Sequence, residues 1–167
     1  YGGTFLGSDA AITIDGPAQL QGGTFRSTSG VLYSRSNVSI ANTFQHNGGT
    51  WRFSAPYLAT RTLSLGATAF RHVTFYSNNG FDAYTLTITG TPSVLGDLEF
   101  QRMNGTNSGT LNGGTLLVHG NVTVQASNYL GSMAVRLVGN SDQTVHATTA
   151  TSHVPNLEIA STGGIVS

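Results

Sequence analysis

The chain has 167 residues, no cysteine and a net charge of zero, with seven arginines, no lysine and only 8% charged residues. A typical soluble domain has about 25% charged residues, so Thr, Ser, Asn and Gly must solubilise this one. Without a basic surface we expect no nucleic-acid partner and no anionic membrane partner, and zero cysteines exclude a disulfide framework and a Cys-ligated metal.

A chain of this length suits one hydrophobic core, and we expect residues 1–167 to form a single domain. No apolar run approaches the roughly 20 residues that a membrane helix needs, so we expect no membrane insertion within it. The sequence begins at YGGTF and stops at GGIVS, inside a repeated phrase at both ends. We therefore expect a segment excised from a longer repetitive protein.

Short strands are expected along the whole chain, because short runs alternate between apolar and polar residues. In chain order these strands are expected at 11–14, 31–33, 38–40, 50–53, 62–65, 73–76, 85–89, 97–100, 115–118, 122–124, 135–138, 144–145 and 156–159. Clusters rich in Gly, Asn and Ser separate many of them. No segment of ten or more residues has helical apolar spacing, so helix should be nearly absent.

Two phrases recur along the chain. The first is a polar turn residue followed by a short strand, written SNVSI, RHVTF, GDLEF, GNVTV and PNLEI, and its first apolar residues lie 35, 25, 24 and 35 residues apart. The second is GGT followed by an apolar residue, at 2–5, 22–25, 48–51 and 113–116, with the variant GGIV at 163–166. Repeats of about 20 to 50 residues are typical of solenoids, propellers and arrays.

The repeats favour an all-β, right-handed parallel β-helix, or solenoid, with short strands and Gly/Asn turns. In a solenoid each turn of the coil, or rung, stacks on the one before it. Equivalent positions must therefore repeat, so that each side chain lies above its copy one rung below. An antiparallel β-sandwich rarely needs this, but it and a β-rich trimeric fibre segment remain alternatives. The uneven spacing predicts insertions near 48–61, 76–84 and 125–133.

All five copies of the first phrase share one polar position, for which we expect a structural turn role. It is occupied by Asn37, His72, Asp97, Asn121 and Asn156. These residue types tolerate tight turns, and Asn hydrogen-bonds adjacent peptide groups. The alternative for Asn37, Asn104 and Asn121 is glycosylation, because each begins an acceptor sequon.

One order of motifs consists of GGTF and a strand, a Gly turn that ends in Gln, and a strand in which Asn-Leu follows a variable residue. This order resembles the repeats of large bacterial cell-surface and adhesin-like proteins. The best match is VRLVGNSDQTVHATTATSHVPNLEIASTGG at 135–164; ITIDGPAQLQGGTF at 12–25 is weaker, and 54–70 departs from the pattern. The resemblance implies an extracellular, bacterial cell-surface repeat protein similar to filamentous adhesins and autotransporter passenger regions. It carries over no catalytic residue, and fold alone does not settle function.

The search for catalytic chemistry is mostly negative. The chain has no GxSxG, HExxH or GxxxxGK motif. Asp97 and Glu99 are the sole candidate pair for a polysaccharide-degrading enzyme, which needs clustered carboxylates. His119 and His146 could align across rungs, but no His spacing is typical of a metal site. We expect no enzyme, no cofactor and no metal.

Aromatic and arginine side chains gather in GGTWRFSAPYLATR at 48–61 and YSNNGFDAY at 76–84. Sugar rings stack on aromatic faces, and irregular loops on a regular scaffold often bind ligands. The candidate ligand-binding residues are therefore Trp51, Arg52, Tyr57, Arg61, Tyr76, Phe81 and Tyr84. Strand alternation offers a different reading, in which Trp51 and Phe53 face the core.

We expect a non-catalytic adhesion or fibre segment that binds a glycan or protein on a host or prey cell surface, or that presents an adhesive tip. A second hypothesis is a stalk or spacer with no ligand, whose strand edges are buried in a homo-oligomer such as a trimer. Ice binding is a third, because it uses flat rows of threonine. Thr85, Thr87 and Thr89 supply one row, and the sequence shows no matching row in other strands.

Overall fold

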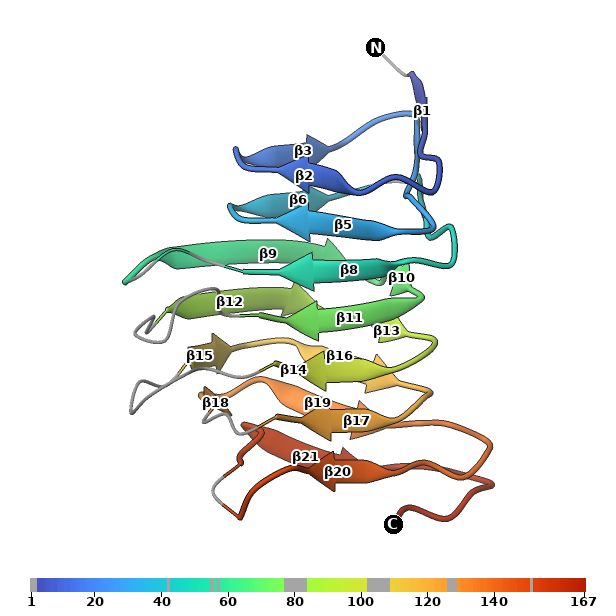
Figure 1. Ribbon diagram of the computed structural model, residues 1–167, viewed down its shortest axis with the longest axis vertical. Coiled ribbons are helices and arrows are strands. Elements are labelled where there is room, and N and C mark those ends of the chain that lie inside the picture. Colours follow the sequence, from blue (N-terminus) through green and yellow to red (C-terminus); the bar gives the residue numbers. More distant parts are fainter. Residues whose placement is uncertain are drawn as a thin grey trace.

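The computed structural model describes residues 3–41, 43–54, 56, 58–76, 84–101, 109–125, 129–150 and 152–167. In these residues every paired strand is parallel to its neighbour and no helix occurs. The chain forms a β-solenoid, as the sequence predicts. Figure 1 shows its rungs, each one turn of the coil, stacked from the N-terminal end at the top to the C-terminal end at the bottom.

One side of the coil is a seven-stranded sheet. Its strands are β2 (Ile12–Ile14), β5 (Val31–Ser34), β8 (Thr50–Phe53), β11 (His72–Phe75), β14 (Leu98–Phe100), β17 (Val122–Val124) and β20 (Val145–Ala147). A second side is a six-stranded sheet. Its strands are β3 (Ala18–Leu20), β6 (Val38–Ile40), β9 (Thr60–Gly66), β12 (Thr85–Gly90), β15 (Gly109–Asn112) and β18 (Tyr129–Leu130).

The third place in each rung belongs to two shorter side sheets. The first contains β1 (Thr4–Leu6), β4 (Thr24–Arg26) and β7 (Thr43–Gln45). The second contains β10 (Ala69–Phe70), β13 (Ser93–Val94), β16 (Thr115–Val118), β19 (Ala134–Leu137) and β21 (Asn156–Ile159). Rung length varies along the coil: Phe25 pairs with Phe44, 19 residues later, whereas Val73 pairs with Leu98, 25 residues later.

Alternation along each strand sends one set of side chains into the coil and the other set to its surface. An inward row of the seven-stranded sheet is apolar on successive rungs, with each member at most 3% exposed: Leu32, Trp51, Val73, Leu98 and Val122. A second inward row stacks Phe53, Phe75 and Phe100, with ring centroids 5.9 and 5.5 Å apart. Aromatic pairs at such distances add to the stability gained from burial.

The repeated phrases do not all stack on one another, contrary to the sequence-based expectation. RHVTF, GDLEF and GNVTV pair in register as β11, β14 and β17, but SNVSI forms β6 in the six-stranded sheet and PNLEI forms β21 in a side sheet. Each side of the coil needs the same local structure, a polar corner followed by a short alternating strand. One phrase therefore serves three sides, and its spacing alone does not give the register.

The polar position of the phrase hydrogen-bonds the next rung. His72 Nδ1 accepts the backbone N–H of Asp97 at 3.0 Å, Asp97 Oδ1 accepts that of Asn121 at 2.9 Å, and Asn121 Oδ1 accepts that of Thr144 at 2.9 Å. Asn37 does the same for Thr62 at 2.9 Å. Asn156 differs, because its side-chain amide donates to the Met133 carbonyl at 3.4 Å. Asn104 lies outside the described residues.

Strands occupy part of the first and third predicted insertions. Residues 50–53 form β8 and residues 60–66 form β9, so the first insertion is confined to the segment between these strands. Residues 129–130, in the middle of the third predicted insertion, form β18. Residues 77–83 and 126–128 lie outside the described part of the chain.

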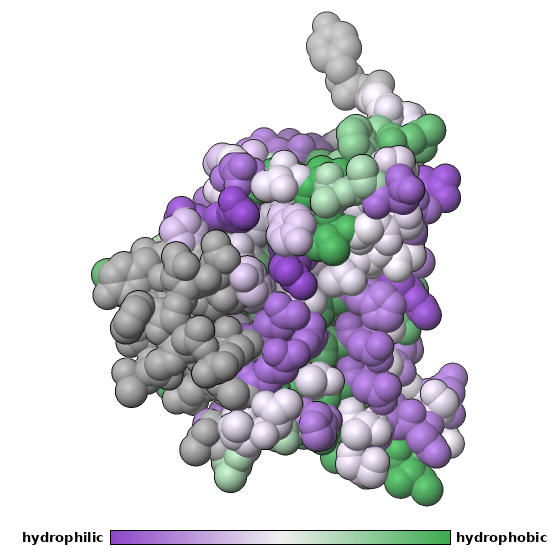
Figure 2. All heavy atoms as spheres, viewed as in Figure 1, coloured by the Kyte–Doolittle hydropathy of each residue, from purple (hydrophilic) through white to green (hydrophobic). Residues whose placement is uncertain are grey.

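Apolar side chains are exposed at both ends of the stack. Phe5 and Leu6 are 46% and 67% exposed at the N-terminal edge, and Ile159 and Ile165 are 64% and 71% exposed in the last rung. Figure 2 shows apolar surface near β1 at the top and near the C-terminal end, with mostly hydrophilic and neutral side chains over the middle rungs. The middle rungs therefore present a mostly polar surface to solvent.

Candidate functional site

Two of the predicted ligand-binding residues are core residues. Trp51 is 3% exposed and its indole Nε1 donates to Ser34 Oγ at 2.6 Å. Tyr84 is 2% exposed, with its hydroxyl 3.2 Å from the Tyr129 hydroxyl. Both side chains point inward, which for Trp51 agrees with the alternation reading, so neither lies on the surface where a ligand would contact it.

The other predicted residues are divided between two sides of the coil. Arg61 lies in β9 of the six-stranded sheet, where its Nη1 donates to the Thr60 carbonyl at 2.9 Å. Arg52 lies in β8 of the seven-stranded sheet, and Tyr76 directly follows β11 of the same sheet. Tyr57 and Phe81 lie outside the described residues.

Arg52 and Tyr76 meet a third side chain, Tyr33, that the sequence analysis missed. Tyr33 in β5 is the register partner of Arg52 in β8, and both occupy outward positions. The Arg52 guanidinium carbon lies 5.5 Å from the centre of the Tyr33 ring and 5.0 Å from the centre of the Tyr76 ring. These distances are within the range of cation–π attraction, so the two rings hold the cation between them.

Tyr33, Arg52 and Tyr76 line a surface hollow of about 240 Å³ together with Arg35 and Ser54. We call it the Arg52 hollow. Successive rungs supply its residues, since the backbone N–H groups of Ser54 and Tyr76 donate to Ser34 and Phe53 at 3.0 and 2.8 Å. The ladder of parallel strands thus fixes the backbone that carries these side chains.

The two arginines of the Arg52 hollow have different electrostatic surroundings. Arg35 is paired with Asp15, with Nη1 to Oδ1 at 3.2 Å. Arg52 has no carboxylate within 4 Å among the described residues, and its Nε is buried there without a hydrogen-bond partner. His46 Nδ1 and Arg61 Nε are buried without a partner in the same way, so this feature alone does not mark a ligand site.

The candidate acid pair, Asp97 and Glu99, forms hydrogen bonds within the coil. Asp97 Oδ1 accepts the Asn121 backbone N–H, and the Glu99 carboxylate accepts hydrogen bonds from the amides of Gln101, at 2.9 Å, and Gln125. Glu99 therefore continues the polar surface of the seven-stranded sheet beyond the Arg52 hollow. Its carboxylate oxygens already bind neighbouring side chains.

The two histidines for which alignment across rungs was only a possibility lie on different sides of the coil. His146 is in β20 of the seven-stranded sheet, whereas His119 directly follows β16 of a side sheet. Because they belong to different sheets, stacking of the rungs does not bring them into one row. Within the described ranges, no three His, Cys, Asp or Glu residues are grouped so that they could hold a metal ion.

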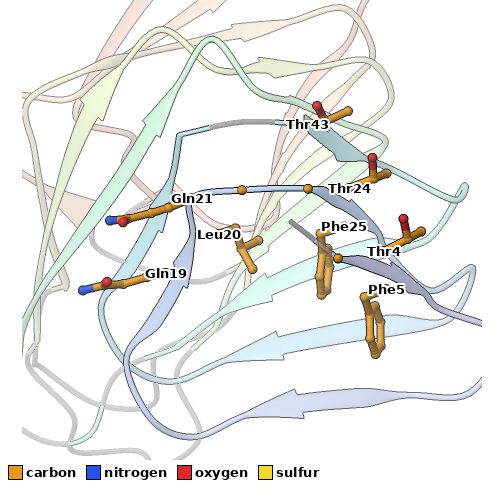
Figure 3. A pocket seen from close by; sticks show the side chains of 11 residues that line it. Thr4, Phe5, Gln19, Leu20, Gln21, Thr24, Phe25 and Thr43 are labelled. Carbon is orange, nitrogen blue, oxygen red and sulfur yellow. The ribbon is translucent and has the colours of Figure 1, made fainter. Parts of the chain in front are cut away.

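A larger hollow, of about 450 Å³, opens at the N-terminal edge of the coil. Figure 3 shows the Phe5 and Phe25 rings side by side in it, with Thr4, Thr24 and Thr43 in a row and Gln19 and Gln21 directed away. The Phe5 and Phe25 centroids are 4.8 Å apart. The described residues that line this hollow carry no charge. Its rings continue the inward aromatic stack, so we assign it to the edge of the core rather than to a binding site.

The outer surface of the six-stranded sheet carries rows of hydroxyl groups. Register aligns Thr60, Thr85 and Thr110 in one row, Thr62 and Thr87 in a second, and Ser64 and Thr89 in a third. The sequence analysis found no match for the Thr85 to Thr89 row, because matching rows become visible only once strands 25 residues apart are paired. These seven hydroxyls make no hydrogen bond within the described part of the chain.

Comparison of the chain with protein-family models, with curated proteins and with solved structures found no match. In the described residues there is no helix with the length and apolarity needed to span a membrane.

Proposed function

We propose that this chain is a non-catalytic adhesion segment of a bacterial surface protein, acting outside the cell and binding a glycan through the Arg52 hollow. The observation that carries the proposal is the Tyr33, Arg52 and Tyr76 cluster, which lies on the outside of a rigid scaffold. Large side chains that are ordered before binding lose little conformational entropy when a ligand arrives. The resemblance of the repeats to adhesin-like proteins supports the same function.

The chemistry of the cluster suits saccharides. Aromatic rings offer apolar faces for sugar rings, and Tyr hydroxyl and Arg groups donate hydrogen bonds to sugar oxygens. The hollow of about 240 Å³ is smaller than the 300–1,000 Å³ of drug-sized pockets. It would therefore receive one unit or substituent of a longer chain that runs over the seven-stranded sheet.

A glycan array tests this proposal. We expect the purified chain to bind a subset of glycans, and the double variant Tyr33→Ala, Tyr76→Ala to lose that binding. Thr123→Ala is the matched control, because Thr123 also lies outward in the seven-stranded sheet, as the register partner of Glu99. An array signal that survives in the double variant, with the fold intact by circular dichroism, would disprove the site.

A second candidate function is ice binding by the six-stranded sheet. Its support is the set of aligned hydroxyl rows, whose members lie one rung, about 4.8 Å, apart and make no hydrogen bond within the described residues. Such a surface could order water in ranks. Thermal hysteresis of the purified chain decides the matter: the candidate requires hysteresis that Thr87→Lys abolishes, and its absence in the unmodified chain removes the candidate.

A stalk or spacer without a ligand is the structural alternative, with the exposed ends of the coil buried in a trimer or against further rungs. Unpaired strand edges favour such association. Light scattering distinguishes these forms, because a monomer at micromolar concentration excludes an obligate trimer. The stalk function alone predicts no glycan signal and no hysteresis.

A further inference from the structure

We infer that the ligand of the Arg52 hollow carries an anionic substituent, a carboxylate or a sulfate on a saccharide, and that Arg52 is its anchor. This inference rests on the proposed function and narrows its ligand class. The first observation is the charge: the whole chain is neutral and has seven Lys or Arg residues, yet two of these, Arg35 and Arg52, line one small hollow.

Two acidic side chains that the structure describes near this hollow already have partners. Asp15 pairs with Arg35 at 3.2 Å, and Glu99 accepts hydrogen bonds from the amides of Gln101 and Gln125. Neither lies within 4 Å of the Arg52 guanidinium. Among the described residues, the positive charge of Arg52 is therefore faced by two tyrosine rings, which attract a cation but cannot neutralise it.

The geometry also prepares Arg52 to recognise an anion. The guanidinium lies 5.5 Å from the Tyr33 ring centre and 5.0 Å from the Tyr76 ring centre, so packing restrains its long side chain. A guanidinium presents its N–H groups in a fixed planar fork that matches the oxygens of a carboxylate or sulfate. A sugar ring on Tyr33 or Tyr76 would bring such a substituent to the fork.

The test compares neutral, carboxylated and sulfated oligosaccharides on one array, followed by affinity measurements at low and high salt. We expect the unmodified chain to prefer acidic members, and its affinity to fall as salt increases, because exposed charges are screened. The carboxylated and sulfated groups of the array distinguish the two sources of charge.

Arg52→Gln should weaken binding to acidic glycans about ten- to a hundredfold, since a hydrogen bond to a charged group contributes about 1.5–3 kcal/mol. Arg52→Lys keeps the charge but loses the planar fork, so its affinity for acidic glycans should lie between that of the unmodified chain and that of Arg52→Gln. Arg71→Gln is the matched control: it removes the same charge from an exposed position outside the hollow and should leave the affinity unchanged.

The outcomes separate the inference from the proposed function. Binding of neutral glycans that depends on Tyr33 and Tyr76 but not on Arg52 would overturn the inference and leave the function standing. Acidic-glycan binding that Arg52→Gln and Arg71→Gln affect equally would also overturn it. If no glycan binds the unmodified chain, both the inference and the proposed function are wrong.

Discussion

Truncating Phe100 should destabilise the solenoid strongly, whereas the same change at Phe5 should have little effect. Phe100 is 0% exposed, and its ring centroid lies 5.5 Å from that of Phe75 and 5.2 Å from that of Tyr129. Phe100→Ala would leave a cavity inside the central rungs, and such changes cost about 3–5 kcal/mol. For a chain of this size, a loss of 1 kcal/mol lowers Tm by about 2–4 °C, so we expect a decrease of roughly 6–20 °C.

Phe5 provides the matched comparison, because it belongs to an aromatic stack of the same kind at the edge of the coil. It is 46% exposed and stacks on Phe25 with a centroid distance of 4.8 Å. Phe5→Ala removes about half of a full burial contribution of 1.5–3 kcal/mol and leaves no enclosed cavity, so the expected loss is about 1 kcal/mol. Differential scanning calorimetry measures both. Equal decreases in Tm for the two variants would refute the stacked-core reasoning.

Two further predictions concern hydrogen bonds and pH. Asn121→Ala should lower the free energy of unfolding, measured with urea, by about 1 kcal/mol because the Thr144 N–H loses its acceptor. Asn121→Asp should be close to neutral, since Asp97 accepts the equivalent hydrogen bond one rung earlier. Equal losses in the two variants would contradict the role of this hydrogen bond between rungs. Burial raises the pKa of Tyr129 above its ordinary value. The unfolded chain then ionises first, so above pH 10, the ordinary Tyr pKa, this group should lower stability by about 1.4 kcal/mol per pH unit. Urea unfolding at a series of alkaline pH values measures how steeply the free energy of unfolding falls with pH. This fall should be less steep in Tyr129→Phe, and an unchanged pH dependence would contradict this burial effect.

Much of the fold follows from local sequence pattern. Alternation found strands such as β8, β14 and β17, because a half-buried strand needs only local polarity to be recognised. It missed β1 and β4, whose GGTF runs look like turns, and β10, which has two residues. Short strands of this kind are stabilised by the rungs above and below, which a local pattern does not contain.

Register was the larger obstacle for the site. Arg52 and Tyr76 stood out in sequence, but Tyr33 becomes their neighbour only when β5 pairs with β8, 19 residues later. The same missing register hid the hydroxyl row formed by Thr60 and Thr85. The gathering of aromatic residues in irregular segments made Trp51 and Tyr84 surface candidates, whereas strand alternation placed Trp51 in the core, where it lies.

The claim that the Arg52 hollow is the ligand site is tested most directly by NMR chemical-shift mapping of the 17.4 kDa chain. A heparin-derived oligosaccharide, which carries both carboxylate and sulfate groups, is the probe. We expect saturable shift changes at Tyr33, at the Arg52 Nε–H and at Tyr76, with none at Thr60 or Thr85 on the six-stranded sheet. Shift changes confined to the six-stranded sheet or to the N-terminal hollow, or none at saturating probe, would contradict it.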